Sequence, residues 1–589
     1  MTAPRPLTID DDPPAAARIA ADITYLASPE LAGRGTGEEG ARLAADYITR
    51  RFVELKLRPD GDREDHGAPR YLQAFQARVG ARVKEASLTL ELKGGARRSP
   101  SEGAVSAAEG TASAAATGKV VFVGYGISAP AAGWDDYGPA DLTGKIALIL
   151  DGTPPPPEAT TAATSPASDP LRDFGSVRYK LRTAREHRAA GVVIVRKSAD
   201  LARSAPADAS SMGVPGVVVS RGFAEGAFPT LRLADPRTWS PARAVKPADL
   251  PAEQVTVKAT IEPVEATAWN VAGLLPGRAD SPQRDEVVVV GAHYDHLGHG
   301  GAFSRAPGVS AIHPGADDNA SGTALLLEVA RRFAALPAAP RRSVLFLAFS
   351  GEELGTLGSR YWVLHPSAPL AHVVAMINAD MVGRLREDRL IVDGVGTARE
   401  WRPLVEGARE GLHLDLAFGA EGFGASDHAS FTAVRVPVAF FFTGVHPDYH
   451  LPSDTADKIN APGEERVATL AGRLALAVAE APERLAFIDA PADPHGGMRG
   501  GFKVSLGTIP DYGFAGPGVK LDGVRPDAPA ARGGLARGDV IVKVGPHEIG
   551  NIHDYMFALG ELEAGRKVVI EVERGGKRVP LEVIPAPGR

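Results

Sequence analysis

The spacing of apolar and polar residues changes several times along the 589-residue chain, and each change predicts a different kind of element. Across residues 15–51 apolar side chains recur at helical spacing, which polar and glycine-rich segments interrupt at residues 28–30 and 33–37. This N-terminal pattern predicts two helices that are joined by a turn and a flexible loop.

A second pattern covers residues 81–260, where short β-branched runs alternate with glycine, proline and alanine. The runs lie at residues 120–123, 146–150, 192–195 and 217–219. They predict a small β-rich or mixed domain. Two low-complexity tracts, at residues 105–117 and 154–169, offer little apolar area to offset the entropy of ordering, so we expect them to be exposed loops.

The central part of the chain alternates between strand patterns and helix patterns. Residues 286–291 and 343–349 are continuous apolar runs typical of buried strands, while residues 323–336 and the segment that ends near residue 364 have helical periodicity. This alternation predicts an α/β sheet that is covered on both faces. Candidate metal ligands begin where these strands end, and that edge is where open α/β sheets place their sites.

The C-terminal part follows a break rich in proline and glycine at residues 489–501. Beyond it, residues 518–524, 539–544 and 567–573 have strand patterns, and residues 552–562 have a helix pattern. We therefore expect a separate C-terminal module.

Composition limits the class of protein. With 44% hydrophobic and 23% charged residues the chain is typical of a globular protein, and its length predicts roughly three to five domains. The net charge of −7, without a long Lys/Arg run, argues against a nucleic-acid partner. The chain has no cysteine, which excludes disulfides, thiolate ligands and a cysteine nucleophile.

The location in the cell is less constrained. Residues 1–14 are polar and rich in proline, without the apolar segment of a signal peptide. No apolar run approaches the roughly 20 residues that span a bilayer, so we expect no membrane span. We expect an exported protein, periplasmic or secreted, whose signal peptide is not part of this chain; a cytoplasmic location is the alternative.

Five separate segments supply side chains of the kinds that bind metals. They contain His293, the pair Asp317–Asp318, the pair Glu352–Glu353, Asp380 and His450. Two imidazoles and three carboxylates suit a pair of divalent cations, and zinc favours nitrogen and oxygen donors of this kind when a water must stay exchangeable. The constellation therefore predicts a hydrolase.

These motifs resemble the M28 family of di-zinc exopeptidases, over residues 15–80 and 255–485. The intervening residues 81–254 resemble a protease-associated domain, through the segments 124–127, 134–137 and 144–146. Residues 501–589 resemble a PDZ domain, through residues 535–541. The resemblance implies an α/β fold: a three-layer α/β/α domain with a mixed sheet, an inserted β-rich domain and a C-terminal PDZ domain.

The resemblance also implies a set of metal ligands. His293 and Asp380 would hold one Zn²⁺ and Glu353 and His450 the other, while Asp318 would bridge the two ions. Asp317 is the competing candidate for the bridge, but the family pattern Asp-x-x-Ser-Gly is met by residues 318–322. In this family the bridging aspartate is followed by a cis peptide bond, which we expect between residues 318 and 319.

Three further residues take roles from the family. Glu352 would be the general base, although an acidic pair after a strand can also cap the next helix. Asp295 would orient the imidazole of His293. Tyr449 would stabilise the oxyanion, and a buried core tyrosine is the alternative. Residues 426–428 match a family segment near the site, where they would support the ligands or position substrate.

Other polar groups have weaker interpretations. His296, His299 and His313 lie in the glycine-rich loop after the first ligand; we expect them to face solvent or the rim of a pocket, with a local metal site as the alternative. Trp134 and the pair at residues 135–136 could shape a substrate channel, but an aromatic side chain in a small β domain is more often part of the core.

The activity expected from the resemblance is hydrolysis of the N-terminal peptide bond of peptides. A C-terminal exopeptidase of the glutamate-carboxypeptidase kind is the alternative. A glutaminyl cyclase would keep one zinc, and a non-catalytic scaffold would have lost ligands, whereas all five positions are present here. The partners would be peptide substrates, with a peptide C-terminus or the protein's own chain in the PDZ groove, whose carboxylate-binding loop would be residues 512–514.

Overall fold

The computed structural model describes most of the chain. The described residues are 7–9, 14–63, 69–92, 94–101, 103–129, 133–154, 171, 174–196, 211–228, 248–250, 254–301, 303–306, 309–420, 422–424, 426–489, 504–510, 517–524, 528–550, 554–555, 558–559 and 562–587. Every statement below concerns these residues.

The centre of the molecule is a mixed sheet of eleven strands. Its middle is parallel and consists of β15 (Ser343–Phe349), β14 (Val287–His293), β16 (Val373–Ala379) and β19 (Val438–Phe442), in that order. Antiparallel neighbours continue the sheet on both sides, with β13 (Gln254–Leu275) next to β15 and β17 (Arg389–Asp393) next to β19. The outermost strand beyond β17 is β18 (Asp415–Phe418), which is parallel to it.

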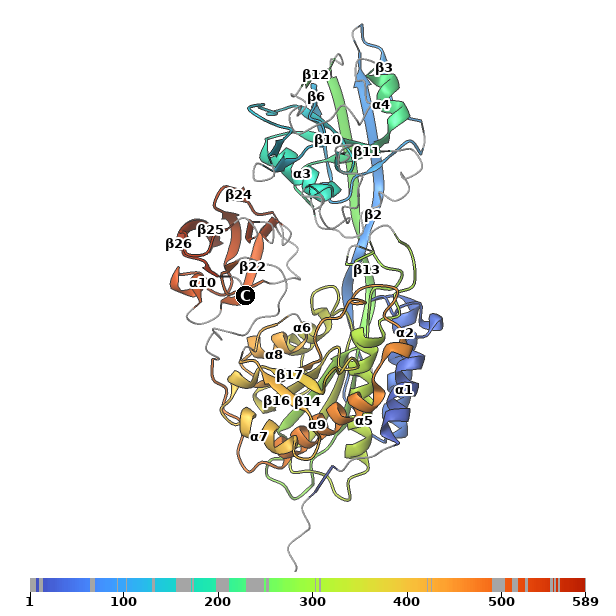
Figure 1. Ribbon diagram of the computed structural model, residues 1–589, viewed down its shortest axis with the longest axis vertical. Coiled ribbons are helices and arrows are strands. Elements are labelled where there is room, and N and C mark those ends of the chain that lie inside the picture. The colour runs from blue at the N-terminus through green and yellow to red at the C-terminus, as the bar shows by residue number, and fades with distance from the viewer. Residues whose placement is uncertain are drawn as a thin grey trace, which may run out of the picture.

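Alternate residues of the central strands are buried on opposite faces of this sheet. Val288 and Val290 pack in a core with α1 (Ala15–Leu26), α2 (Glu39–Glu54), α5 (Gly322–Ala334), α7 (Trp401–Ala408) and α9 (Ala461–Glu480). Val287 and Val289 pack in a second core with α6 (Leu357–Leu364) and α8 (His428–Ala433). The continuous apolar runs are thus explained by burial on both faces, and three α/β/α layers result (Figure 1).

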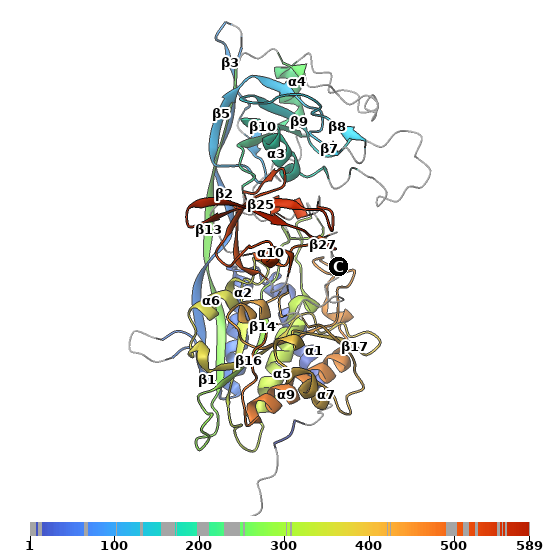
Figure 2. The same ribbon diagram turned by 90° about the vertical axis from the view of Figure 1, so that its left-hand side faces the viewer.

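Two long strands leave this sheet together. β2 (Leu72–Glu91) pairs with β13 in antiparallel register over almost its whole length. Both ends of the pair are buried, whereas the residues between them are mostly half-buried or exposed. The ribbon carries the insert, which we define as residues 92–253, away from the central sheet (Figures 1 and 2). The expected boundaries at residues 80/81 and 254/255 fall inside β2 and at the start of β13, and they stay a prediction.

The insert contains a second sheet of six strands, in the order β12 (Ala248–Asp249), β6 (Val120–Phe122), β9 (Ile146–Leu150), β10 (Gly191–Arg196), β11 (Gly216–Ser220) and β4 (Val105–Ala107). Helix α3 (Val177–Glu186) packs on one face, where it begins with Ser176 accepting a hydrogen bond from the amide of Tyr179. Helix α4 (Arg221–Ala227) and the end of the ribbon pack on the other face. All four predicted strands of this region are present.

The prediction of an exposed loop at residues 105–117 is wrong. Residues 105–107 form β4, and residues 114–118 form β5 (Ala114–Gly118), which pairs with β13. These strands are held by backbone hydrogen bonds to neighbouring strands, which a pattern of side chains does not record. The second tract, residues 154–169, falls almost entirely outside the described residues.

The C-terminal module, residues 504–587, has its own sheet with β21 (Thr508–Pro510), β22 (Val519–Val524), β23 (Val540–Val544), β25 (Val568–Arg574) and β26 (Lys577–Val583) in that order. The predicted helix near residues 552–562 lies mostly outside the described residues. The module has its own buried core and touches the insert at α3. Figures 1 and 2 show it beside the long ribbon, between the insert and the central sheet.

The guanidinium of Arg185 on α3 makes this contact. It donates to the Asp554 carboxylate at 3.1 Å and to the Glu548 carbonyl oxygen at 3.1 Å. His547 and Glu186 approach to 3.5 Å beside it. None of the helices in the described part of the chain combines the length and the apolar composition that crossing a membrane requires.

Candidate metal centre

The candidate ligands gather at the carboxyl ends of the central parallel strands, as the sequence predicts. His293 is the last residue of β14, Asp380 directly follows β16, and Glu353 lies in the turn after β15. Asp318 lies in a kinked turn, η9 (Ala316–Ser321), directly before α5, and its own backbone angles are not helical. His450 lies beyond the end of β19. The topology therefore brings five distant segments of the chain to one place.

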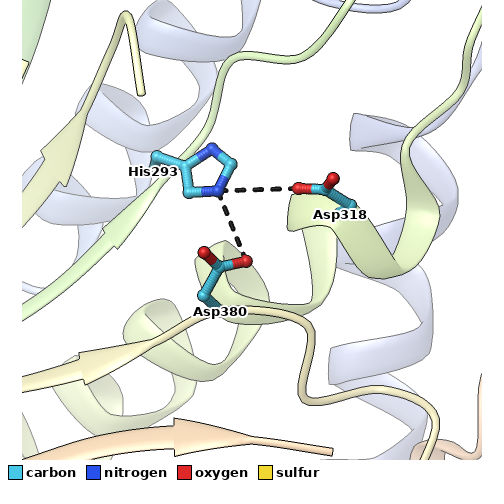
Figure 3. A group of neighbouring side chains, drawn as sticks. All are labelled: His293, Asp318 and Asp380. Carbon is cyan, nitrogen blue, oxygen red and sulfur yellow. Dashed lines mark ion pairs between the residues drawn. The ribbon is translucent and has the colours of Figure 1, made fainter. Parts of the chain in front are cut away.

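The two carboxylate oxygens of Asp318 face two different groups of side chains. Oδ1 lies 3.6 Å from Nε2 of His293, which in turn lies 3.4 Å from Oδ1 of Asp380 (Figure 3). Oδ2 lies 3.2 Å from Nε2 of His450, which lies 3.1 Å from Oε2 of Glu353. One carboxylate thus joins two clusters of nitrogen and oxygen donors.

These spacings fit bound cations. Donors that each lie 2.0–2.1 Å from a tetrahedral zinc are roughly 3.3 Å apart, which is close to the separations here. Nε2 of His293 and Oδ1 of Asp380 are buried, and neither has a hydrogen-bond partner among the described residues. Buried polar atoms without a partner are rare in proteins, because losing water without a replacement is costly. The donor set and its unpartnered atoms therefore suit a pair of divalent metal ions.

The electrostatics of the cluster also favour cations. Burial lowers the pKa of His450, but Glu353 and Asp318 outweigh burial and raise it to about 11. Burial raises the pKa of Glu352 well above its usual range, and Asp380 and Glu353 raise it further. Several carboxylates in a buried space repel one another, and positive charge placed between them relieves this repulsion.

Asp295 connects three parts of the site. Its carbonyl oxygen lies 3.2 Å from Nδ1 of His293, so the backbone rather than the carboxylate is the nearer partner of that imidazole. The carboxylate accepts a hydrogen bond from the hydroxyl of Thr36 at 2.7 Å and another from the backbone amide of Glu352 at 3.2 Å. Asp295 thus contacts both the imidazole of His293 and the turn that carries the glutamate pair.

Glu352 and Tyr449 lie next to the two donor clusters. Oε2 of Glu352 lies 3.9 Å from Nε2 of His293. The next helix, α6, begins several residues later without a side-chain cap, so the helix-capping alternative for the acidic pair is wrong. The ring of Tyr449 is half-buried and stacks on the ring of His450, with 3.9 Å between the centroids.

Asp317 points away from both clusters. Its Oδ1 accepts a hydrogen bond from the amide of Gly383 at 2.7 Å, and its Oδ2 lies 3.2 Å from Nε2 of His446. Of the two neighbouring aspartates, only Asp318 faces the candidate ligands. The peptide bond between Asp318 and Asn319 is cis, as expected.

Arg34 is a supporting residue that the sequence pattern did not reveal. Its guanidinium is fully buried and donates to the carbonyl oxygens of Tyr294, Pro314 and Gly315 at 2.7–2.8 Å, as well as to that of Leu26. It thereby ties the N-terminal segment to both the His293 and the Asp318 loops. The expectation of a flexible loop at residues 33–37 is wrong, because these hydrogen bonds cross more than 250 positions of sequence and leave no local pattern.

The three loop histidines differ in their surroundings. His296 and His313 are buried, so the expectation that they face solvent is wrong for both. His299 is exposed. Nδ1 of His296 lies 2.6 Å from Oε1 of Glu353, and Nε2 of His313 lies 2.7 Å from the hydroxyl of Ser304. A histidine three positions after a ligand could have been considered as part of the same site.

The remaining candidates are not donors of either cluster. Ser426 accepts a hydrogen bond from the side chain of Asn378, and His428 stacks on Phe440. Trp134 is buried in a small core of the insert, and so the core interpretation of this residue is confirmed. Residues 512–514 lie outside the described residues.

Two family models match the chain. Residues 270–475 match Peptidase family M28, which includes all five candidate ligands, and residues 501–584 match the PDZ domain. Neither of these two matches covers the insert, whose likeness to a protease-associated domain stays a prediction.

Individual relatives are similar over part of the chain. Aminopeptidase YwaD of Bacillus subtilis (strain 168) is 32% identical over 228 residues, which is 37% of this chain and 46% of the relative. Leupeptin-inactivating enzyme 1 of Streptomyces exfoliatus is 29% identical over 194 residues, 33% of this chain and 39% of the relative. The chain thus spans about half or less of the length of these two curated relatives. An aminopeptidase structure from Aneurinibacillus sp. strain AM-1 aligns over 81% of this chain and 97% of its own, with 24% identity and a TM-score of 0.47.

Proposed function

We propose that this chain, whose residues 270–475 form a domain of peptidase family M28, is a metal-dependent aminopeptidase. The observation that carries the proposal is the division of the Asp318 carboxylate between two donor clusters, each with one histidine and one further carboxylate. This arrangement is suited to two cations that share one carboxylate. The names of the curated relatives, which include several aminopeptidases, support the same class of reaction.

The proposed cofactor is a pair of Zn²⁺ ions. His293 and Asp380 would hold one ion, Glu353 and His450 the other, and Asp318 would bind both. When bound, the ions would act as Lewis acids toward a peptide carbonyl and lower the pKa of a shared water. The count of two rests on the two donor clusters, while the choice of zinc rests on their imidazole and carboxylate composition.

The chain's own groups would carry the proton. Glu352 is an acidic side chain on the Nε2 side of His293 that the proposed ligand set leaves free, so it can accept a proton from the attacking water and return it to the leaving amine. Asp295 holds the backbone of Glu352 and the imidazole of His293, which keeps this geometry in place. Tyr449, stacked on His450, would donate to the developing oxyanion, a contribution on the order of 3 kcal/mol.

The other parts of the proposal concern the domains and the location. We propose that residues 15–80 and 255–485 form the catalytic unit, that residues 81–254 are a protease-associated domain, and that the PDZ module binds a peptide C-terminus or the protein's own chain. Export to the periplasm or the medium is proposed as well, and fractionation of the producing cells tests it.

Two alternatives use related sites. A C-terminal exopeptidase could use the same two clusters, and the choice of substrate distinguishes it from an aminopeptidase. A glutaminyl cyclase would need only one cation, whereas the Glu353–His450 cluster supplies donors for a second.

An assay of the purified chain tests the proposal. Zinc content is measured by elemental analysis. Hydrolysis is measured with chromogenic aminoacyl substrates and peptides that have a free N-terminus, and with the same compounds blocked at the N-terminus. Two zinc ions per chain and cleavage only of the unblocked substrates are expected. Cleavage of blocked peptides from their C-terminus would support the carboxypeptidase alternative, and a single ion would support the cyclase.

A further inference from the structure

His296 has an unusual position for a residue outside the proposed ligand set. The residue is 2% exposed and its Nδ1 lies 2.6 Å from Oε1 of Glu353, a proposed ligand. Its Nε2 is buried and has no hydrogen-bond partner among the described residues. Among the described residues, Glu353 is thus the hydrogen-bond partner of this ring.

The backbone around His296 holds the ring firmly. The amide of His296 donates to the carbonyl oxygen of Arg34 at 3.0 Å, and the residue forms an isolated β-bridge with Gly35. Gly315 packs against the ring so closely that an added Cβ would lie 2.5 Å from its Cδ2. Gly315 also has a φ of +57°, so both its backbone and its neighbour favour glycine. The ring cannot readily turn away from Glu353.

The two oxygens of Glu353 are thereby distinguished. Oε1 faces Nδ1 of His296, and Oε2 faces Nε2 of His450 at 3.1 Å. Nδ1 of His296 lies 3.9 Å from Oδ2 of Asp318, whereas Nε2 of His450 lies only 3.2 Å from that oxygen. Nδ1 of His296 lies at hydrogen-bond distance from one oxygen of Glu353, which suits a hydrogen-bond donor. His450 lies closer to both carboxylates of the cluster, which suits a metal ligand.

We propose that His296 is a positioning residue, which donates its Nδ1–H to Oε1 of Glu353 and so holds Oε2 toward the cation shared with His450. This inference rests on the proposed function, since it concerns one of the two proposed metal sites. Groups that orient metal ligands typically change metal affinity by 10–100-fold when they are removed. His296 would do so for a carboxylate ligand rather than for an imidazole.

The test compares His296→Ala, His296→Asn and, as a matched control, His299→Ala, which changes an exposed histidine of the same loop. The asparagine amide can replace Nδ1–H as a donor, whereas alanine cannot. Zinc is titrated into the chelator-treated full chain, and binding at both sites is measured together with the visible spectrum of the cobalt-loaded protein. Circular dichroism establishes that each variant is folded.

We expect His296→Ala to bind the second ion at least tenfold more weakly and to change the cobalt spectrum. His296→Asn should recover most of the affinity, and His299→Ala should match the unaltered chain. Unchanged binding in His296→Ala would overturn the proposal. Equal weakening in the folded alanine and asparagine variants would also overturn it, because an amide nitrogen cannot replace a metal-binding imidazole. Failure of the unaltered chain to bind two ions would instead contradict the proposed function.

Discussion

The hydroxyl of Thr36 donates a hydrogen bond to the carboxylate of Asp295 at 2.7 Å, although the two residues lie 259 positions apart in the chain. Both side chains are buried. The carboxylate of Asp295 also accepts a hydrogen bond from the amide of Glu352, so one carboxylate connects the N-terminal loop to the turn that carries Glu352. The loop at residues 33–37 is thus part of the site.

Thr36→Val should test this support, because valine keeps the shape of threonine and removes its hydroxyl. A buried carboxylate oxygen without its donor costs about 1–3 kcal/mol, which we expect as a lower free energy of unfolding. Thr36→Ser, which keeps the hydroxyl, is the control. Thermal unfolding of the metal-free chain measures the effect, and equal melting temperatures for the valine and serine variants would contradict it.

Glu352→Gln should keep both metal ions and lose most of the turnover. The amide has nearly the same shape as the carboxylate but cannot accept the proton, and general bases contribute about 10²–10⁴-fold. We expect a fall of that size in kcat with little change in KM, measured beside zinc content. A variant with near-normal kcat would remove Glu352 from the mechanism.

Asp318→Ala should lose bound zinc, since the carboxylate that joins both clusters is removed. Asp317→Asn provides the matched comparison, because Asp317 contacts Gly383 and His446 instead. Elemental analysis after dialysis should find two ions in the Asp317 variant and fewer in the Asp318 variant. The reverse result would transfer the bridging role to Asp317.

The C-terminal module should be removable from residue 501 onward without loss of metal, because all five candidate ligands precede it. If the module gates or recruits peptides, the truncated chain should hydrolyse small chromogenic substrates normally and longer peptides differently. Unchanged rates for both kinds of substrate would exclude this role.

Arg185 and Asp554 should stabilise the docking of the module on the insert. The Asp554 side chain is 1% exposed, so loss of the Arg185 partner leaves a buried carboxylate with less compensation. We expect Arg185→Met to weaken this docking and to lower the free energy of unfolding of the chain. Thermal unfolding of Arg185→Met, Asp554→Asn and the double variant measures the effect, and free-energy losses that simply add would contradict a direct interaction.

Asp136 should make the stability of the insert depend on pH. Burial raises its pKa to about 6, while its Oδ2 accepts hydrogen bonds from the amides of Tyr125 and Ile127. A folded-state pKa above the unfolded value of 3.8 means that stability is fully present below about pH 4 and is lost as the pH rises through about 6. The difference corresponds to roughly 3 kcal/mol.

Hydrogen exchange of the insert, corrected for the intrinsic dependence on pH, measures this loss. Asp136→Asn keeps an acceptor for the two amides and should show nearly constant protection across the same range. If protection in Asp136→Asn falls as much as in the unaltered chain between about pH 4 and 6, another group causes the pH dependence.

Part of the candidate metal centre is predictable from the sequence, because two of its candidate ligands end or directly follow strands whose apolar runs are themselves recognisable. His293 ends β14 and Asp380 follows β16, so parallel pairing alone brings them to one edge. The pattern Asp-x-x-Ser-Gly also distinguishes Asp318 from Asp317 before any geometry is known.

The supporting residues could not be predicted in this way. Arg34 binds carbonyl oxygens of distant segments, and an arginine between two glycines has the same local pattern whether it is buried or exposed. His296 contacts the carboxylate of a residue 57 positions away. Strands β4 and β5 form because neighbouring backbones offer partners, which side-chain patterning does not encode.

The paired strands β2 and β13 constrain how the insert can move. Their extended length is about 65 Å at 3.3 Å per residue, and both ends lie inside packed cores. Between residues 260 and 270, β13 pairs with β2 alone among the described residues, and this stretch contains two register irregularities. Sliding one strand by a residue would turn its buried side chains outward at both ends. The insert is therefore held at a fixed separation along the two strands, and any movement relative to the central sheet would have to bend or twist the stretch between the packed ends.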